Sequence, residues 1–298
     1  LNEVYEMGKR IAITGANGQL GQTLMRSELF EKHILLPLGR DDMDITDQAK
    51  VSATLDSLKP DFIINAAAFT AVDAAESHPE QAYNINEQGV KHLARWAKSK
   101  KAHLIHVSTD FVFAGDKNRP YKVDDATGPI SLYGQSKLAG EKMIATLLPG
   151  KATIVRTAWL YSPYNSNFMK TMLRLMRERD SLSVVDDQIG TPCSTQSLVA
   201  CLHAVIARNE PGATYHWTDA GVASWYDFAV AIQDEAISMS LLDRAIPIHP
   251  ISTEKYKTPA ARPAYSVLDK SKALLELQCP QQHWREALRD TLRTLSEK

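Results

Sequence analysis

A glycine-rich turn directly after the first apolar segment limits the fold more than any other feature. Arg10 to Thr14 is suited to a short buried strand, and glycines follow at positions 15, 18 and 21. A helix-like segment, Gln22 to Leu29, begins at once. In a strand–turn–helix unit, glycines let the backbone turn sharply and approach a pyrophosphate, and the helix N-terminus favours that anion. The turn therefore predicts a dinucleotide site rather than a ligand-free turn.

Strand-like and helix-like segments alternate for about 150 residues around this turn. The further apolar strands are expected at His33 to Leu38, Asp61 to Asn65, Leu104 to Asp110 and Thr153 to Thr157. Met43 to Ile45 is expected to be an additional short extended segment, which makes Thr153 to Thr157 the sixth strand. A long helix is expected from about Pro79 to Lys98, with Asn86 exposed on it. This alternation predicts an α/β fold, a Rossmann-type doubly wound parallel sheet with helices on both faces.

The regular alternation fades beyond Trp159. Helices are expected at 168–177, 196–208 and 225–237, with a final helix that carries Trp284. Strands are expected at 181–185 and 214–218, the second returning to the sheet. We therefore expect a dinucleotide-binding domain over residues 7–160, with return segments around 195–220. Residues 161–194 and 221–298 would form a smaller substrate-binding lobe with the C-terminal helix. Residues 1–6 are left out of these fold expectations.

Tyr133 and Lys137 lie four residues apart in a segment expected to be helical. That spacing places a phenol and an ammonium on one helix face, one turn apart. A fixed positive charge favours the phenolate and lowers the pKa of the phenol, which makes it a usable acid or base. Alone, the pair is better explained as a solvated helix face. It gains weight because the glycine turn supplies a hydride carrier, and because Thr109 ends a strand that faces the same crevice.

Arg40 follows the second strand at the position that discriminates between the two nicotinamide cofactors. A carboxylate there would bind the ribose 2′-hydroxyl of NAD, whereas an arginine suits the 2′-phosphate of NADP. Asp41 and Asp42 come next, so NADP is favoured and NAD stays open. Ala66, Ala67 and Ala68 follow the third buried strand. Their small side chains would let the backbone lie against a ligand, or would serve tight packing equally well.

Composition excludes several classes of partner. Lys and Arg number 34 and Asp and Glu 35, so the net charge is −1. This balance offers no basic face for nucleic acid or an acidic membrane surface. No apolar run approaches the roughly 20 residues that span a bilayer. The three widely spaced cysteines favour reduced thiols and a cytoplasmic protein. The nine histidines lack metal-ligand spacing. His106, within an expected strand, and His103, just before it, are both expected to be packed.

From about Lys9 onward the chain resembles the dTDP-4-dehydrorhamnose reductase family, within the extended short-chain dehydrogenase/reductase superfamily. The segments that carry the resemblance are Thr14 to Gly21, Asn65 to Glu76, Ser108 to Phe113, Tyr133 to Glu141, Arg156 to Tyr161, Asn167-Phe168, Asp187 to Pro192 and Arg262 to Ser266. The glycine pattern and the Tyr133/Lys137 pair are shared by the whole superfamily. The segments at Thr70 to Glu76, at Trp159 and at Asp187 to Pro192 are specific to the reductases.

The resemblance implies reduction of the C4 ketone of dTDP-4-dehydro-L-rhamnose by NADPH or NADH, which gives dTDP-L-rhamnose for cell-envelope polysaccharide. It implies these catalytic residues: Thr109, Tyr133 as proton donor, and Lys137. It implies these cofactor contacts: Gly15, Asn17, Gly18, Gln19, Leu20, Arg40, Asp44, Ile45, Ala66, Ala67, Ala68, Tyr133 and Lys137. It implies these substrate contacts: Val72, Asp110, Phe111, Trp159, Asn167 and Arg262, with Arg262 at the diphosphate.

The chain departs from the family pattern at Cys193, Ala261, Phe69 and Phe111. Ala261 replaces a second arginine beside the diphosphate contact, and the two phenylalanines remove hydrogen-bonding groups in or near the sugar pocket. These changes would retune the substrate without changing the reaction class. One alternative is a reductase or epimerase of another nucleotide sugar. A second alternative is a non-catalytic, NADP-binding regulatory subunit of the methionine adenosyltransferase type. A Mg²⁺ requirement and a homodimer rest on the family alone.

Overall fold

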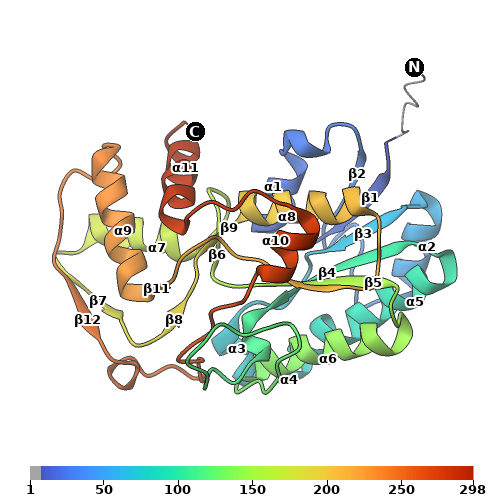
Figure 1. Ribbon diagram of the computed structural model, residues 1–298, viewed down its shortest axis with the longest axis horizontal. Helices are drawn as coiled ribbons and strands as arrows, with labels where there is room; N and C mark the ends of the chain where they lie inside the picture. Colours follow the sequence, from blue (N-terminus) through green and yellow to red (C-terminus); the bar gives the residue numbers. More distant parts are fainter. Residues whose placement is uncertain (1–7, 298) are drawn as a thin grey trace.

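The computed structural model describes residues 8–297, and Figure 1 shows its elements. Residues 1–6 and the expected domain start at residue 7 lie outside this range. A six-stranded sheet with the order β10-β5-β4-β3-β1-β2 forms the centre of the larger part. Its strands are β1 (Arg10–Thr14), β2 (Ile34–Leu38), β3 (Phe62–Asn65), β4 (His103–Thr109), β5 (Ala152–Thr157) and β10 (Thr214–His216). Every pairing in this sheet is parallel, which confirms the expected doubly wound fold.

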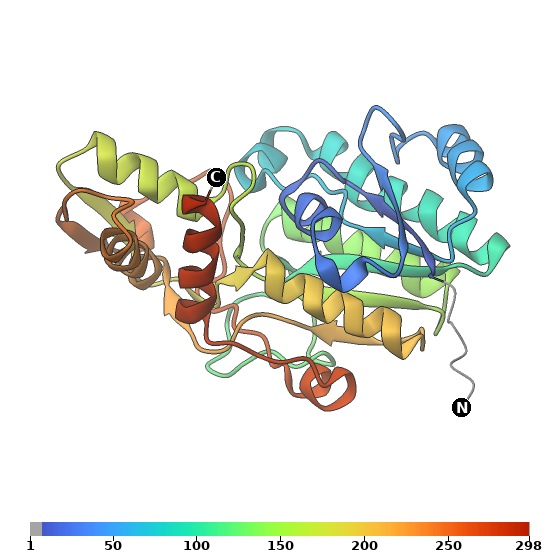
Figure 2. The ribbon, with the colours of Figure 1, turned by 90° about the horizontal axis from the view of Figure 1, so that it is seen from above.

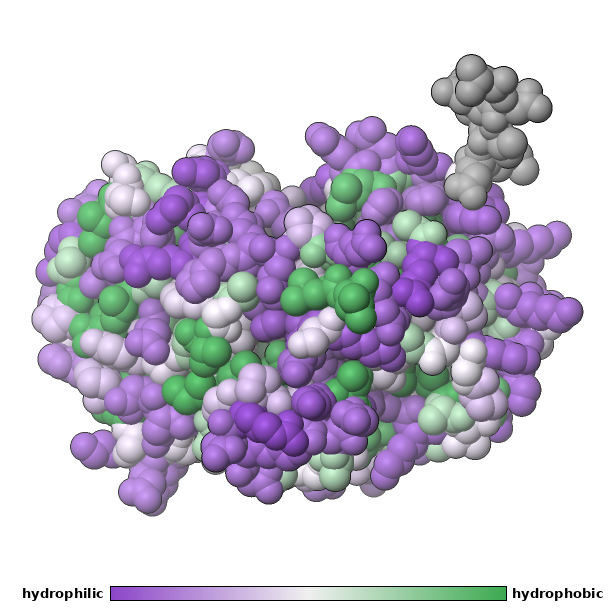
Figure 3. Space-filling model, in the orientation of Figure 1, coloured by the Kyte–Doolittle hydropathy of each residue, from purple (hydrophilic) through white to green (hydrophobic). Residues whose placement is uncertain are grey.

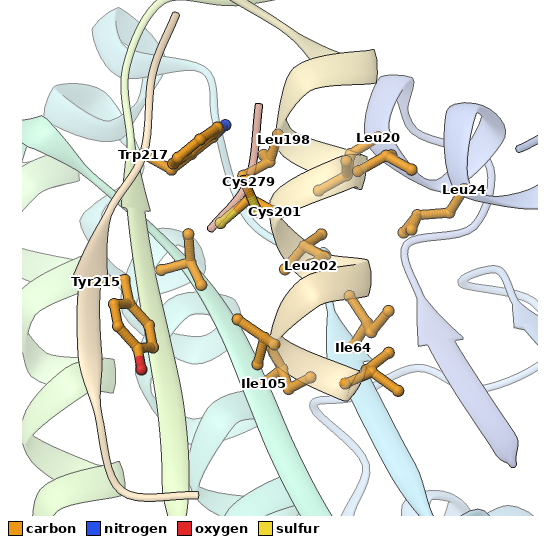
Figure 4. Close-up of a cluster of buried hydrophobic side chains, with 14 of the residues drawn as sticks. Leu20, Leu24, Ile64, Ile105, Leu198, Cys201, Leu202, Tyr215, Trp217 and Cys279 are labelled. Carbon is orange, nitrogen blue, oxygen red and sulfur yellow. The ribbon is translucent and has the colours of Figure 1, made fainter. Parts of the chain in front are cut away.

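Helices cover both faces of the sheet (Figures 1 and 2). One layer consists of α1 (Gln19–Met25), α8 (Thr195–Arg208) and α10 (Ser271–Leu277), and the other of α2 (Gln48–Leu58), α5 (Val90–Lys100) and α6 (Leu132–Leu147). Alternate residues of a strand point to opposite faces. Ile11 and Ile13 accordingly belong to the core under the first layer, part of which Figure 4 shows, and Ala12 to the core under the second.

The strand order places a ligand crevice at the carboxyl ends of β1 and β3. The chain leaves β1 toward β2 at one side and returns to β3 at the other side of β1. At such a switch point the two connections diverge, which leaves a crevice where α/β proteins bind their ligands. The glycine turn follows β1 and the alanine run follows β3. Both sequence-predicted cofactor segments therefore meet at the switch point.

A third hydrophobic cluster lies beside the sheet, at the left of Figure 1. Its main elements are α7 (Phe168–Glu178), α9 (Trp225–Ser238), α11 (Trp284–Ser296) and the parallel pair β7 (Leu182–Val185) and β12 (Ile248–Ile251). Short pairings link this region: β6 (Leu160–Tyr161) with β9 (Cys193–Ser194), and β8 (Ile189–Gly190) with β11 (Ala223–Ser224). The smaller elements are α3 (Val72–Ser77), α4 (Pro79–Tyr83), η1 (Glu28–Phe30), η2 (Asn84–Gly89), η3 (Asp110–Val112) and η4 (Thr253–Lys255). A division into two domains at the expected boundaries remains a prediction.

Two local expectations are wrong. Residues 43–45 form no strand, so β5 is the fifth strand along the chain rather than the sixth. Asn86 is only 1% exposed and lies in η2, a π-helical turn between α4 and α5. Its Oδ1 accepts a hydrogen bond from the Phe69 backbone N–H at 2.8 Å, and its Nδ2 donates to Ser136 Oγ at 2.9 Å. Asn86 therefore fixes the segment after β3 against α6.

The face shown in Figure 3 is mainly hydrophilic, with apolar residues in small separate patches. Across residues 8–297, no helix has the length and apolar character needed to cross a membrane. All three cysteines are free and buried, in agreement with the reduced thiols expected from their spacing.

Candidate active site

One cavity of about 940 Å³ opens at the carboxyl ends of the strands. Its lining contains these sequence-predicted site residues: Gly15, Gly18, Gln19, Leu20, Arg40, Asp44, Ile45, Ala66, Ala67, Ala68, Val72, Thr109, Asp110, Phe111, Tyr133, Lys137, Trp159, Asn167 and Arg262. Asn17 is the exception. It is exposed in the same loop, and its carbonyl oxygen accepts hydrogen bonds from Gln22 and Asn165. The fold thus brings together residues that are as much as 247 positions apart, Gly15 and Arg262.

The glycine turn packs directly on the segment after β3. Gly15 has a φ of +67°, a conformation that residues with a Cβ rarely adopt. A Cβ at this position would also lie 2.8 Å from the Ala67 nitrogen and 2.9 Å from the Ala66 carbonyl carbon. The sequence left open whether these alanines allow tight packing or contact with a ligand. Both interpretations apply, because the alanines pack against the turn and also line the cavity. This bare backbone wall is suited to an extended dinucleotide phosphate.

Arg40 is the cation at the rim of this wall. Its side chain is 75% exposed and its Nε lies 3.4 Å from Asp44 Oδ2. Asp42, a competing carboxylate in the sequence, instead accepts a hydrogen bond from the Gly39 backbone at 2.8 Å. A backbone hydrogen bond from Thr46 lowers the pKa of Asp44. The exposed guanidinium, with the Asp42 carboxylate engaged by the Gly39 backbone, fits a cofactor with a 2′-phosphate.

Tyr133 enters the cavity from the first turn of α6, whose N-terminus is capped by Ser131. Burial raises the pKa of Tyr133 to about 12, against the opposing effect of a hydrogen bond with Thr109. The sequence expectation that Lys137 lowers this pKa is therefore wrong. The Lys137 ammonium is turned toward the Val107 carbonyl oxygen, 2.7 Å from Nζ. A phenol that stays protonated at neutral pH is suited to donate a proton.

Lys137 lies only 2% exposed between the sheet and α6. Burial lowers the pKa of Lys137 to about 8, and the carboxylate of Glu141 opposes this shift. Glu141 itself forms a buried ion pair with Arg156, with Nη2–Oε2 at 2.7 Å. His106 Nε2 lies 3.3 Å from Lys137 Nζ. His106 is packed, as expected, but its contact with the lysine was missed because strand periodicity does not reveal a partner on another element.

Asp110 and Phe111 continue from Thr109 along the cavity wall. Asp110 is 1% exposed and accepts a hydrogen bond from Thr109 Oγ1 at 3.0 Å. Burial raises the pKa of Asp110 to about 6. The Phe111 ring meets the Tyr133 ring edge to face, with centroids 5.6 Å apart. The reacting end of the cavity thus combines a neutral phenol, a hydroxyl and a buried carboxyl group.

Arg262 reaches the cavity but is already ion-paired. Its Nη2 lies 2.8 Å from Asp73 Oδ2, and its Nη1 lies 3.1 Å from Asp73 Oδ1. Nη1 also donates to Thr258 Oγ1 at 2.5 Å. Nε has no hydrogen-bond partner within residues 8–297. A guanidinium has two edges that can bind an anion in a bidentate manner. Asp73 occupies one edge, and the Nε edge is available to a ligand.

Trp159 is enclosed between Trp225 and Gly190. The indole rings of Trp159 and Trp225 are stacked, with centroids 3.5 Å apart and planes 6° apart. A Cβ at Gly190 would lie 2.5 Å from Trp159 Cε2 and slightly farther from its bonded neighbours, Nε1 at 2.7 Å and Cζ2 at 2.8 Å. If this Cβ lay in the plane of the indole, it would be nearer to Nε1 or Cζ2 than to Cε2. Because Cε2 is the nearest atom, Gly190 lies over a face of the indole, the one that Trp225 does not cover. Only an edge of Trp159 is available to the cavity.

Trp225 also lines the cavity and is the main site residue that the sequence expectations did not identify. It opens α9 directly after Ser224, which forms a capping box with Asp227. The sequence carries this helix-start signal, a serine followed three residues later by an acidic residue. It does not show that the first turn of the helix lies over a strand end from another part of the chain.

Asn167 contributes to the site through its structural contacts. Its Oδ1 caps α7 by accepting a hydrogen bond from the Lys170 backbone at 3.1 Å. Its Nδ2 donates to Gln19 Oε1 at 3.0 Å, which links α7 to the glycine turn. Over the described range, no group of three or more His, Cys, Asp or Glu side chains could hold a metal ion.

Comparison with known proteins gives consistent relatives along the whole chain. A family model described as the RmlD substrate binding domain matches residues 9–297. A dTDP-4-dehydrorhamnose reductase from Aggregatibacter actinomycetemcomitans is 41% identical over 287 residues, covering 94% of this chain and 97% of the relative. A dTDP-4-keto-6-deoxy-D-glucose reductase from Streptomyces niveus is 37% identical, covering 95% of this chain and 96% of the relative.

Solved structures agree with this result. The dTDP-4-dehydrorhamnose reductase of Bacillus anthracis, in complex with NADP, superposes with a TM-score of 0.91 at 37% identity. The match covers 97% of this chain and 100% of that chain. A dTDP-4-dehydrorhamnose reductase from Clostridium acetobutylicum gives a TM-score of 0.90 at 39% identity, covering 96% and 99% of the two chains.

Proposed function

This chain belongs to the RmlD substrate binding domain family, and on that premise we propose that it reduces the C4 ketone of dTDP-4-dehydro-L-rhamnose to dTDP-L-rhamnose. The observation that carries the proposal is the position of Tyr133. A buried, protonated phenol stands beside Thr109 in the same cavity as the glycine turn. Curated relatives of nearly equal length are dTDP-4-dehydrorhamnose reductases. All three proposed catalytic side chains are present, which favours an enzyme over a non-catalytic NADP-binding subunit.

The cofactor proposed for this reaction is NADPH, which supplies the hydride when bound. The backbone between Gly15 and Leu20 and the Ala66–Ala68 segment would receive the pyrophosphate and neighbouring groups. Arg40 would bind the 2′-phosphate, a role that suits an exposed guanidinium. Support for NADPH also comes from the NADP complex of the Bacillus anthracis reductase. Asn17, Asp44 and Ile45 complete the proposed cofactor contacts.

Tyr133 would donate its proton to the ketone oxygen as the alcohol forms, and Thr109 would hydrogen-bond the same oxygen. The phenol carries its proton throughout the neutral range, because its pKa lies well above 7. Burial makes it a weaker acid, and the hydrogen bond with Thr109 partly offsets this effect. Lys137 would hold the cofactor ribose and assist the return of a proton to the phenolate. These three groups lie on β4 and α6, so the sheet edge positions them before any ligand binds.

The sugar nucleotide would lie between Asp110 and the aromatic side chains of the cavity. Val72, Phe111 and the edge of Trp159 offer apolar surface to a 6-deoxy sugar, with Asn167 nearby. Arg262 would bind the diphosphate through its Nε edge while Asp73 holds the adjacent Nη1/Nη2 edge. Ala261 supplies no second guanidinium here, so Arg262 would carry this contact alone.

A related reduction is the second candidate. The Streptomyces niveus relative acts, by its name, on dTDP-4-keto-6-deoxy-D-glucose and is 37% identical over 284 residues. Phe69 and Phe111 remove hydroxyl groups near the sugar pocket and therefore bear on which sugar is accepted. Both candidates share the 4-ketone, the dTDP group and the role of Tyr133, so they differ in the sugar alone.

The test is a steady-state assay with dTDP-4-dehydro-L-rhamnose and dTDP-4-keto-6-deoxy-D-glucose, each with NADPH and with NADH. We expect oxidation of NADPH that depends on the first sugar, and NMR of the product identifies its configuration at C4. Protein that binds NADPH but turns over neither sugar would refute the proposal. A stoichiometric enzyme partner in a pull-down, without reductase activity, would instead support the regulatory alternative. That the protein forms a homodimer remains a prediction, and the oligomeric state of the same preparation would test it.

A further inference from the structure

We propose that Thr14, Asn65 and His106 form a buried hydrogen-bonded chain that positions Lys137 and sets the charge on its amine. The three would be positioning residues for the reaction proposed above, since none of them lines the cavity. This inference rests on the proposed function for the role of Lys137. The chain of contacts itself lies inside the sheet and connects the lysine to the cofactor wall.

The three side chains occupy one row across three adjacent strands. Thr14 of β1 is the register partner of Asn65 of β3, which is the register partner of His106 of β4. In-register residues of neighbouring strands project from the same face. All three are at most 1% exposed. The row therefore exists because the strand order places β1, β3 and β4 side by side, a relationship that the linear sequence does not display.

The contacts along this row are continuous. The Ala67 backbone nitrogen lies 3.3 Å from Thr14 Oγ1, and Thr14 Oγ1 lies 2.6 Å from Asn65 Oδ1. Asn65 Nδ2 lies 2.9 Å from His106 Nδ1. His106 Nε2 then lies 3.3 Å from Lys137 Nζ. Ala67 lines the cofactor wall, so the row runs from that wall to the amine of Lys137.

With the Asn65 amide oriented as in the structure, the hydrogen bonds along the row run in one direction. The Ala67 N–H donates to the Thr14 hydroxyl, which donates to the Asn65 carbonyl oxygen. The Asn65 amide nitrogen then donates to His106 Nδ1. Burial, with the charge of Lys137, lowers the pKa of His106 well below its ordinary value, so the imidazole is neutral. A neutral imidazole carries one N–H. With Nδ1 accepting, that hydrogen lies on Nε2 and points at Lys137.

An N–H directed at Nζ favours the neutral amine, because an ammonium group offers no acceptor. The ammonium form requires the opposite arrangement, with His106 Nε2 as acceptor and the Asn65 amide reversed. Other groups around Lys137 act differently. Glu141, one turn further along α6, favours the ammonium and is itself paired with Arg156. Tyr133 and Asp110 face the same region, the first as a neutral phenol. The row thus opposes Glu141 in fixing the charge of Lys137.

Two substitutions separate this role from simple packing. In Asn65→Asp, a carboxylate facing Nδ1 requires the hydrogen on Nδ1, which turns Nε2 into an acceptor for the ammonium. In Thr14→Val, the donor that holds the Asn65 amide is replaced by a methyl group of similar size. His103→Leu is the matched control, because His103 is a buried histidine of the same strand whose hydrogen-bond partner, Thr153, lies outside the row.

The measurement is the dissociation constant of NADPH as a function of pH, followed by cofactor fluorescence. Wild type should lose affinity as pH rises through about 8, where Lys137 loses its charge. Asn65→Asp should shift this loss of affinity to a pH that is higher by about one unit or more, the usual effect of a nearby opposite charge. Thr14→Val should move it in the same direction by less, and His103→Leu should leave it in place. The alkaline limb of kcat/KM should follow the same order.

The proposal is overturned if both row variants fold and lose NADPH affinity over the same alkaline pH range as wild type. This holds whatever the two substitutions do to thermal unfolding. If the buried charge of Asn65→Asp prevents folding, Thr14→Val alone provides the test. A shift of its alkaline loss of NADPH affinity supports the proposal, and no shift overturns it. The NADPH titration needs no sugar nucleotide. A protein that reduces no sugar would therefore refute the proposed function, while the shift of the binding limb would still test the row.

Discussion

Asp73 holds Arg262, a cavity-lining residue, through two hydrogen bonds, Nη1–Oδ1 at 3.1 Å and Nη2–Oδ2 at 2.8 Å. Asp73 belongs to α3, and Arg262 lies 189 residues further along the chain. The guanidinium also lowers the pKa of Asp73, mainly through their hydrogen bonds. The ion pair therefore fixes which edge of the guanidinium remains open to a ligand.

Arg262→Ala should raise the KM for the sugar nucleotide roughly 10- to 100-fold with little change in kcat, because a hydrogen bond to a charged group contributes about 1.5–3 kcal/mol. Steady-state kinetics measure this. Arg244→Ala is the matched control, since Arg244 is an exposed arginine paired with Asp180 away from the cavity. An unchanged KM in Arg262→Ala would remove the diphosphate contact from the proposed site.

Tyr133→Phe should reduce turnover by roughly 10²–10⁴-fold, the usual contribution of a positioned general acid. The ring remains, and with it the edge-to-face contact with Phe111, so NADPH affinity and thermal stability should stay near those of wild type. Turnover, cofactor titration and thermal unfolding are measured on one preparation. Normal turnover would exclude Tyr133 as the proton donor.

Arg40→Ala should weaken NADPH more than NADH, because only NADPH carries the 2′-phosphate that the guanidinium would bind. The loss of a charge-assisted hydrogen bond predicts roughly a 10-fold change in the ratio of the two dissociation constants. Arg26→Ala is a suitable control, since Arg26 lies against the Tyr164 ring rather than on the cavity wall. Equal weakening of both cofactors would refute the assignment.

Trp225→Ala should raise the KM for the sugar nucleotide by roughly 10-fold, because the edge of Trp159 is held by a stacked ring and an aromatic pair contributes about 0.5–1.5 kcal/mol beyond its buried area. Near-ultraviolet circular dichroism should lose the signal of the stacked pair. Tyr226→Ala is the control from the same helical turn, outside the cavity lining. If both variants change the KM equally, the stack has no specific part in binding.

Asp110→Asn should stabilise the fold at neutral pH and reduce activity. The pKa of Asp110 is raised from 3.8 to about 6 by burial. A carboxyl group with a raised folded pKa contributes stability at low pH that is lost as pH rises from about 4 to 6. Replacing it with an amide removes a loss of stability on the order of 3 kcal/mol at neutral pH. Thermal unfolding of both proteins against pH should show curves that separate over this interval and nearly coincide below it.

The sheet and the reacting residues could be predicted from the sequence because their signals are local. Apolar runs set β1 to β5, the Gly15 turn marks the first crossover, and the spacing of Tyr133 and Lys137 needs only one helix. Parallel strands then bring their carboxyl ends to one edge. This logic placed Thr109 and the Ala66–Ala68 segment correctly.

The rest of the site depends on contacts between distant segments, which local patterns do not encode. Asn86 resembled an exposed helix residue because nothing nearby in sequence shows Phe69 and Ser136 around it. The pKa of Tyr133 was assigned the wrong direction because helix spacing indicates a close lysine but not the carbonyl toward which it turns. Trp225 was missed for the same reason, since its partner Trp159 comes from another part of the chain.

The position of β10 has a consequence for how the protein forms during synthesis. This strand pairs with β5 at the edge of the sheet, yet the chain reaches it only at residues 214–216 of 298. Until then the outer edge of β5 has no partner strand, although its other edge pairs with β4, and such open edges invite pairing with other chains. The helix α8, which covers one face of the sheet, is also made late. The sheet of the cofactor-binding part therefore cannot be completed before residues 161–194, the first segment of the substrate side, have been synthesised.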